Sequence, residues 1–356
     1  MTETSSPPLL RPGVPVRDPW PGARPFRYDG WLERNGFAPA WTALAVLVLA
    51  WVAFQLIGGL VGGIWIGVAL ATEGGGTTPS AGEVADLVGR YPGAMIVANT
   101  AGQVLGLGLI GWLAARWTAR TGTGAFLRMR RPQVRGAALA VGGWLALLPL
   151  LFWSAELNAL LPLPEWLKDL EALQTDLLQA LLVDGAIGVG WLVLALAVTP
   201  ALFEEVLFRG YLQRQVERRW GVVASVVLVG VLFGFFHMRL TQVVPLALLG
   251  VYLGYAVWAT GSLWTGTLVH LLHNGTVIVA LDAARRAGVL EAPAMAEASV
   301  PWWAALLGLT VAAPVLLALR RHRARATGGW HDGDLSLDGL APSPALDADA
   351  VVPAGG

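Results

Sequence analysis

Cysteine is absent from the 356-residue sequence, which excludes disulfide bonds, thiolate metal sites, a cysteine nucleophile and lipid attachment through sulfur. Charge is scarce as well, because only 13% of the residues are Asp, Glu, Lys or Arg, against about 25% in an average soluble domain. Acidic and basic residues both number 24, so the charge balance gives no reason to expect nucleic acid as a partner. Since 55% of the residues are hydrophobic, the sequence predicts a membrane protein.

Long apolar segments fill the middle of the chain. A helix needs about 20 residues to cross roughly 30 Å of hydrocarbon. Eight segments approach or exceed that length: 41–71, 93–115, 136–154, 184–208, 221–238, 242–260, 262–281 and 300–319. They are apolar on all sides, which favours helices over the alternating strands of a barrel. We therefore expect an all-α polytopic membrane protein with about eight transmembrane helices.

The two ends of the chain differ from this membrane domain, which we place at residues 39–320. Residues 1–38 are rich in proline and lack the apolar stretch of a signal peptide, so they are predicted to form a disordered cytoplasmic leader. Residues 321–356 are predicted to form a disordered C-terminal tail.

Arginine and lysine are distributed unevenly over the stretches between the apolar segments. Alternate stretches carry 19 and 5 of these residues, with the leader on the richer side. The positive-inside rule then predicts that both termini are cytoplasmic and that residues 155–183 lie outside, as an amphipathic segment at the interface. Lysine occurs once among the 24 basic residues, a bias typical of GC-rich bacterial genes, so we expect a bacterial inner membrane and its lipid as surroundings.

Ionisable side chains inside the apolar segments are the first functional signal. Each costs about 2.5–3.5 kcal/mol at the centre of a membrane helix on insertion scales, and is by default a candidate for a functional site. They gather in three predicted helices, as the set Glu204, Glu205, Arg209, His237, His270 and His273.

The motif Glu204-Glu205-Val-Leu-Phe-Arg209 places two acids and one arginine on one helix. Glu205 and Arg209 are four residues apart, so an internal ion pair accounts for both. Glu204 lies about 100° away around the helix and has no partner within the motif. A carboxylate of this kind is suited to act as a general base, while a purely structural acid pair is the alternative. Pro200 predicts a kink beside it.

Two further motifs add polar groups. Phe233 and His237 share one helix face, and His270 and Asn274 share another. Taken singly, His237 is interpreted as an interfacial residue, and His270 with Asn274 as a pair that hydrogen-bonds a neighbouring helix. His273 lies off the face of Asn274 and is expected to be structural.

The three motifs in this order, Glu-Glu-x-x-x-Arg, Phe-x-x-x-His and His-x-x-x-Asn, resemble the CPBP family. That family comprises the CAAX prenyl endopeptidases and their bacterial and archaeal relatives, including proteins linked to bacteriocin processing and self-immunity. The resemblance covers residues 184–281 and implies that Glu204 and His237 activate a water for hydrolysis of a peptide bond. It also implies that His270 and Asn274 stabilise the oxyanion, while Glu205 with Arg209, next to Phe233, supports the site.

The cofactor requirement is open to two readings. A glutamate, two histidines and an asparagine could bind Zn²⁺ with a free position for water, although the motif His-Glu-x-x-His is absent. The family resemblance favours a glutamate protease without a metal or other cofactor. The depth of His237 is also open, because only a long hairpin turning near Trp220 would bring it level with Glu204.

We therefore expect an intramembrane endopeptidase that cuts a peptide or membrane-protein substrate near the membrane surface. One alternative is a non-catalytic immunity or scaffold protein of the same fold that binds a peptide. The other is a proton-coupled transporter whose buried Glu and His form a relay, although no inverted repeat is evident.

Overall fold

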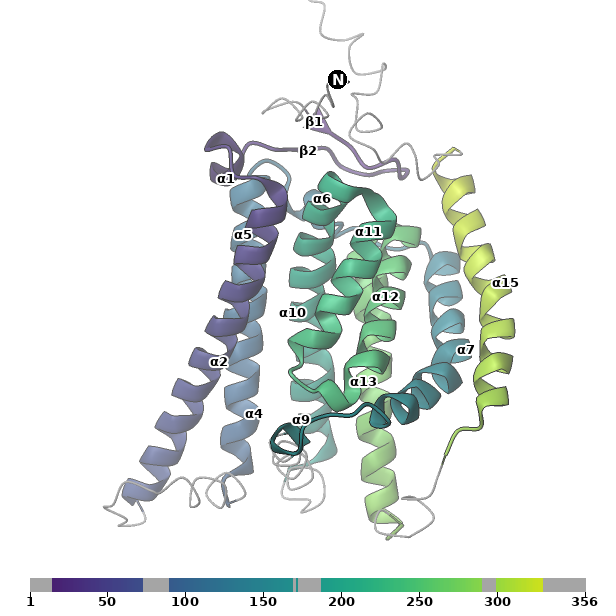
Figure 1. Ribbon diagram of the computed structural model, residues 1–356. Coiled ribbons are helices and arrows are strands. Elements are labelled where there is room, and N and C mark those ends of the chain that lie inside the picture. The colour runs from purple at the N-terminus through teal and green to yellow at the C-terminus, as the bar shows by residue number, and fades with distance from the viewer. Residues whose placement is uncertain (1–14, 73–89, 169–170, 172–186, 290–298, 329–356) are drawn as a thin grey trace, which may run out of the picture.

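The computed structural model describes residues 15–72, 90–168, 171, 187–289 and 299–328. These residues form a bundle of long helices that carries a small two-stranded sheet at one end (Figure 1). The long helices and their π-helical turns (η1–η3) and 3-10 turn (η4) are α2 Pro39–Thr72, α4 Pro92–Ala101, η1 Gly102–Leu109, α5 Ile110–Thr118, α7 Val134–Ala159, α9 Val189–Val193, η2 Leu194–Val198, α10 Thr199–Glu205, η3 Val206–Leu212, α11 Gln213–Phe236, η4 Leu240–Gln242, α12 Val243–Thr260, α13 Leu263–Arg286 and α15 Trp302–Ala326. The short elements are β1 Pro15–Val16, β2 Phe26–Arg27, α1 Trp31–Arg34 and α6 Thr123–Phe126.

Seven helical runs in the described ranges are long and apolar enough to cross a membrane. They are Pro39–Thr72, Pro92–Thr118, Val134–Ala159, Val189–Phe236, Leu240–Thr260, Leu263–Arg286 and Trp302–Ala326. The chain is therefore an all-α, multi-pass membrane protein, as predicted.

The run Val189–Phe236, 48 residues long, folds back on itself and accounts for two of the predicted segments. Gly221, within α11, has φ 79° and ψ −179°, a conformation that interrupts the helix and that glycine adopts at little cost. The rings of Phe208 and Phe236 are 5.1 Å apart, whereas 28 residues of straight helix would separate them by about 42 Å. The predicted hairpin near Trp220 therefore exists.

Residues 15–38 correct our prediction of a disordered leader. β1 pairs antiparallel with β2, and the side chains of Val16, Trp20, Phe26 and Tyr28 are buried against the end of the bundle. The prediction weighed the prolines and overlooked these apolar side chains, which are enough to hold the segment. Residues 1–14 lie outside the described residues.

Ion pairs attach this segment to the hairpin. Asp18 accepts hydrogen bonds from both terminal nitrogens of Arg214, at 2.8 and 3.0 Å, and Glu33 does the same for Arg218, at 2.7 and 3.0 Å. Burial raises the pKa of the Asp18 carboxyl, but the charges of Arg214 and Arg128 outweigh that effect and hold the pKa below its ordinary value.

The two described ends of the chain meet. Trp20 lies against His322, with ring centroids 6.1 Å apart, and against the guanidinium of Arg323, at 5.6 Å. Both ends are therefore on the same side of the bundle, as an even number of crossings requires. Residues 321–326 continue α15 as helix, contrary to the predicted start of the tail at 321, and residues 329–356 lie outside the described residues. Of the predicted external segment 155–183, residues 169–170 and 172–183 also lie outside them.

Candidate active site

Glycines bring η1 against α10, the helix that carries Glu204. A Cβ on Gly108 would lie 2.2 Å from a ring carbon of Phe203, and one on Gly111 would lie 3.1 Å from the Cα of Leu207. On the opposite face, Gly106 leaves no room for a Cβ beside the backbone of Phe54 in α2. Because η1 packs this closely between α2 and α10, even a short polar side chain on it reaches the neighbouring helix.

Gln103 of η1 uses this approach to hold Glu204. Its Nε2 donates a hydrogen bond to Oε1 of Glu204 at 2.9 Å, and both side chains are buried. The second oxygen of the carboxylate, Oε2, is buried and has no hydrogen-bond partner within the described part of the chain. Glu204 is thus held at one oxygen and leaves the other available.

Glu205 and Arg209 form the expected ion pair, with 2.7 Å between Oε1 and the guanidinium and no exposure of either side chain. Arg209 also donates to the carbonyl of Gly250 in α12, at 3.0 Å. Gly266 of α13 makes room for the pair, because a Cβ there would lie 2.6 Å from Oε2 of Glu205. The pair therefore ties α10 and η3 to α12 and α13.

His270 lies between the two glutamates. Its Nδ1 is 3.1 Å from Oε1 of Glu205, and its Nε2 is 4.0 Å from Oε2 of Glu204. A carboxylate only accepts hydrogen bonds, so Nδ1 carries the proton that faces Glu205. Nε2 is the nitrogen that faces the available oxygen of Glu204.

Phe233 packs at the centre of this group. Its ring lies 4.4 Å from the guanidinium carbon of Arg209, 5.7 Å from the ring of His270 and 4.8 Å from the ring of His237. His237 has its Nδ1 2.8 Å from the carbonyl oxygen of Phe233, which only accepts, so this nitrogen carries a proton and Nε2 of the neutral ring is an acceptor. Phe233 therefore joins the second motif to the first and third.

Asn274 owes its position to Pro200. Proline has no N–H, so it cannot donate to the carbonyl of Leu196 four residues earlier. Nδ2 of Asn274 donates to that carbonyl at 3.2 Å. An amide nitrogen has two protons, so Asn274 keeps one donor for another partner. π-helical turns lie on either side of α10, which begins next to Pro200, and turns of this form are often found at functional sites.

The structure thus gathers most of the predicted residues, partly by contacts that the spacing indicated, such as the pair of Glu205 and Arg209, and partly by contacts between helices that spacing does not indicate. Glu204, Glu205, Arg209, His270 and Phe233 form one contact group, whereas His237 and Asn274 contact Phe233 and η2. Among the described residues, neither His237 nor Asn274 forms a hydrogen bond with Glu204. His273 points away from the group and accepts a hydrogen bond from Nε1 of Trp144, at 3.2 Å, as its expected structural role requires.

Gln103 is the residue that the sequence analysis missed. It carries no charge, so it is not among the ionisable side chains by which the sequence indicated the site. The signal that could have found it is a lone amide among glycines, in the stretch Gly102-Gln-Val-Leu-Gly-Leu-Gly-Leu-Ile-Gly111.

The donor set does not fit a resident metal ion. Zinc sites bring three protein ligands within about 2.0–2.2 Å of one ion. Within the described ranges, no group of three or more His, Cys, Asp or Glu side chains is placed to hold one.

The fold and the site together define a polytopic helical membrane protein with a buried group of glutamate, arginine and histidine. Residues 186–276 match the family model of the Rce1-like type II CAAX prenyl endopeptidases, in agreement with the CPBP resemblance. Comparison with curated proteins and with solved structures gives no match. The family whose model matches these residues is one of endopeptidases.

Proposed function

We propose that this chain hydrolyses a peptide bond in a peptide or membrane-protein substrate, with Glu204 as the base that activates water. The proposal rests on the different surroundings of the two oxygens of the Glu204 carboxylate. Gln103 fixes Oε1, while Oε2 is buried, has no hydrogen-bond partner among the described residues and faces His270. A positioned carboxylate of this kind is what general base catalysis needs.

In the proposed reaction, Oε2 of Glu204 takes a proton from water while the water oxygen attacks the carbonyl carbon of the substrate. The resulting tetrahedral intermediate carries its negative charge on the former carbonyl oxygen. As the carbon–nitrogen bond breaks, Glu204 gives the proton to the departing amine. The carboxylic acid that forms gives its remaining proton to the amine, so the products are a carboxylate and an ammonium group, and Glu204 returns to its starting state.

His270 and Asn274 are proposed as the donors that stabilise the oxyanion. His270 has Nδ1 engaged by Glu205 and turns Nε2 toward the Glu204 side. Donation to an oxyanion in this proposal requires a proton on Nε2. Asn274 has one amide proton left after its bond to Leu196.

His237 is proposed to orient the water. Its Nδ1 faces the backbone carbonyl of Phe233, which fixes the tautomer and leaves Nε2 as an acceptor. We place the protein in the inner membrane of a bacterium, with both termini in the cytoplasm, on the Arg/Lys asymmetry of the loops.

The variant Glu204→Gln tests the proposal, because it keeps the shape of the side chain but cannot accept the proton. Membranes of cells that express the wild type or the variant are compared for new peptide termini by mass spectrometry. Termini that depend on the wild type identify substrates, and a peptide that spans such a site is then assayed with purified protein. Loss of a general base lowers the rate by about 10²–10⁴-fold.

The control is His273→Ala, which removes a histidine of the same helix that faces α7 instead of the site. It is expected to cleave at close to the wild-type rate. If Glu204→Gln also cleaves at the wild-type rate, Glu204 is not the base. If neither the wild type nor Glu204→Gln generates new termini, a peptide-binding role without catalysis replaces the proposal.

The absence of a metal step is tested with a strong chelator. We expect the purified protein to keep its rate of peptide cleavage after chelation and dialysis. A rate that is lost and then returns on addition of Zn²⁺ would show that a metal takes part.

A further inference from the structure

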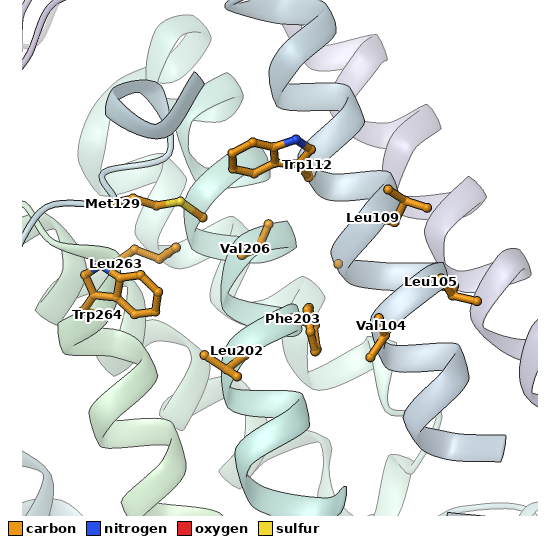
Figure 2. Close-up of a pocket in the computed structure, with 11 residues that line it drawn as sticks. Val104, Leu105, Leu109, Trp112, Met129, Leu202, Phe203, Val206, Leu263 and Trp264 are labelled. Carbon is orange, nitrogen blue, oxygen red and sulfur yellow. The ribbon is translucent and has the colours of Figure 1, made fainter. Parts of the chain in front are cut away.

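Two pockets with opposite character meet at Met129. The first is an apolar groove of about 420 Å³ between the helix η1–α5 and the start of α13, with α10 and η3 as its floor (Figure 2). Its lining includes Leu105, Leu109, Trp112 and Trp264, and every residue that lines it is apolar or glycine. The second pocket, of about 560 Å³, lies beside the segment 15–38 and also includes Met129.

The second pocket is strongly basic. Arg24, Arg128, Arg130 and Arg131 line it, and Asp18 is its only acid, which gives a formal charge of +3. Both oxygens of Asp18 already accept from Arg214. Arg128 is engaged by Glu217, at 2.6 and 2.9 Å, and is therefore part of the structure.

The other three arginines of this pocket have no carboxylate partner in the described part of the chain. Arg130 donates to the carbonyls of Thr260 and Gly261, at 2.8 Å each, and of Pro21, at 3.4 Å. Its guanidinium lies 4.6 Å from the ring of Trp20, and no carboxylate among the described residues bonds to it. Arg24 and Arg131 are exposed and make no hydrogen bond or ion pair within the described part of the chain. Guanidinium groups held in this way are suited to bind a phosphate.

The two pockets are arranged in the same order as the hydrocarbon and headgroup regions of one membrane leaflet. The apolar groove runs along residues of the spans Pro92–Thr118 and Leu263–Arg286, whereas the basic pocket is built from the loop between α5 and α7 and from the segment 15–38. The side chains of Trp112 and Trp264 lie near the junction, as tryptophans at the membrane interface do. One lipid could therefore place its acyl chain in the apolar groove and its phosphate in the basic pocket, because the two pockets lie at the corresponding depths.

We propose that this composite site binds one anionic phospholipid, with an acyl chain in the groove and the phosphate among Arg24, Arg130 and Arg131. A lipid with a cationic choline group is a poorer fit, because the only acid in the basic pocket is already paired with Arg214. The site is distinct from the hydrolytic group around Glu204 and does not depend on the proposed reaction.

The test is native mass spectrometry of the purified full-length protein, titrated with phosphatidylglycerol, with phosphatidylcholine or with glycerol 3-phosphate. We expect a single phosphatidylglycerol to bind at least tenfold more tightly than phosphatidylcholine. The double variant Arg24→Gln/Arg131→Gln should weaken phosphatidylglycerol binding on the order of tenfold or more, since each basic side chain near the surface contributes on this scale. Val104→Phe/Leu109→Phe, which narrows the groove, should weaken both lipids.

The matched control is Arg27→Gln/Arg34→Gln. It removes the same charge from two exposed residues of the segment 15–38 that do not line the pocket. It should bind phosphatidylglycerol within about twofold of the wild type. Equal losses in the two arginine variants would show a general surface effect and overturn the proposal. Equal binding of the two lipids, or equally tight binding of glycerol 3-phosphate, would overturn it as well.

Discussion

Gln103 donates a hydrogen bond to Glu204 across 101 residues of sequence, and it does so from a helix outside the matched residues 186–276. The proposed base therefore depends on a part of the chain that the family match does not cover. The glycines of η1 are the reason, because they let this helix approach α10 closely enough for a hydrogen bond of 2.9 Å.

Replacing Gln103 by Met should remove this donor while keeping the length of the side chain. A hydrogen bond to a charged group contributes about 1.5–3 kcal/mol, so we expect kcat to fall roughly 10- to 100-fold. KM should change little, because Gln103 holds the base and does not contact the substrate in the proposed reaction. Steady-state kinetics on the substrate peptide measures both, with Thr100→Ala, whose hydroxyl bonds only within its own helix, as the control. A fall in folded protein with unchanged kcat would assign Gln103 to stability alone.

Breaking the pair of Glu205 and Arg209 should destabilise the protein. Removal of one partner of a buried ion pair costs about 3–5 kcal/mol, because the other charge is left unpaired. Arg209→Met and Glu205→Gln are each expected to lower the thermal midpoint of the purified protein. The double variant should lose less than the sum of the two, which a double-mutant cycle measures. Strict additivity would show that the two side chains do not interact.

Acid should release the segment 15–38. The folded-state pKa of Asp18 is below its ordinary value, so Asp18 stabilises the attachment above about pH 4 and this stabilisation is lost as the pH falls through the lowered value. The protection of the amides of residues 15–28 against hydrogen exchange, after correction for the intrinsic pH dependence of exchange, should therefore be constant from pH 7 to 5 and fall below about pH 4. Asp18→Asn should lower the protection at pH 5–7 and should differ less from the wild type at acid pH, where Asp18 is itself protonated. Asp29, whose pKa is lowered by hydrogen bonds from Thr121 against the effect of burial, adds to the same transition.

The absence of cysteine makes the topology easy to test, because a single introduced thiol can be labelled without background. In whole cells, a maleimide that does not cross the membrane should label Thr175→Cys and spare Ala354→Cys. Permeabilised cells should label both. Labelling of Ala354→Cys in intact cells would put the C-terminus outside and overturn the predicted orientation.

The parts of the fold that depend on local patterns could be predicted from the sequence. Spans follow from apolar length, and the pair of Glu205 and Arg209 follows from their spacing on one helix. Local spacing fixes the face of a helix but not the neighbour that this face meets. For that reason the partners of Gln103, and the bond from Asn274 to Leu196, were out of reach.

The segment 15–38 shows a second limit. Its prolines indicate an irregular backbone, and an irregular backbone was equated with disorder. Phe26 and Tyr28 are nevertheless buried, at 1% and 3% exposure, because they pack on helices that lie far along the chain. Whether a proline-rich segment is ordered depends on the surface that is available to it, and that surface is a property of the fold.

The attachment of Asp18 to Arg214 sets an order of events during synthesis of the chain. The two residues are 196 positions apart, and Glu33 is 185 positions from Arg218. The segment 15–38 emerges first from the ribosome, yet its ionic partners are made only when the fourth span is complete. Its docking therefore comes late in biogenesis. The ion pairs wait for Arg218, and the contact of Trp20 with Arg323 waits for the end of α15, by which point the proposed catalytic helices have been made.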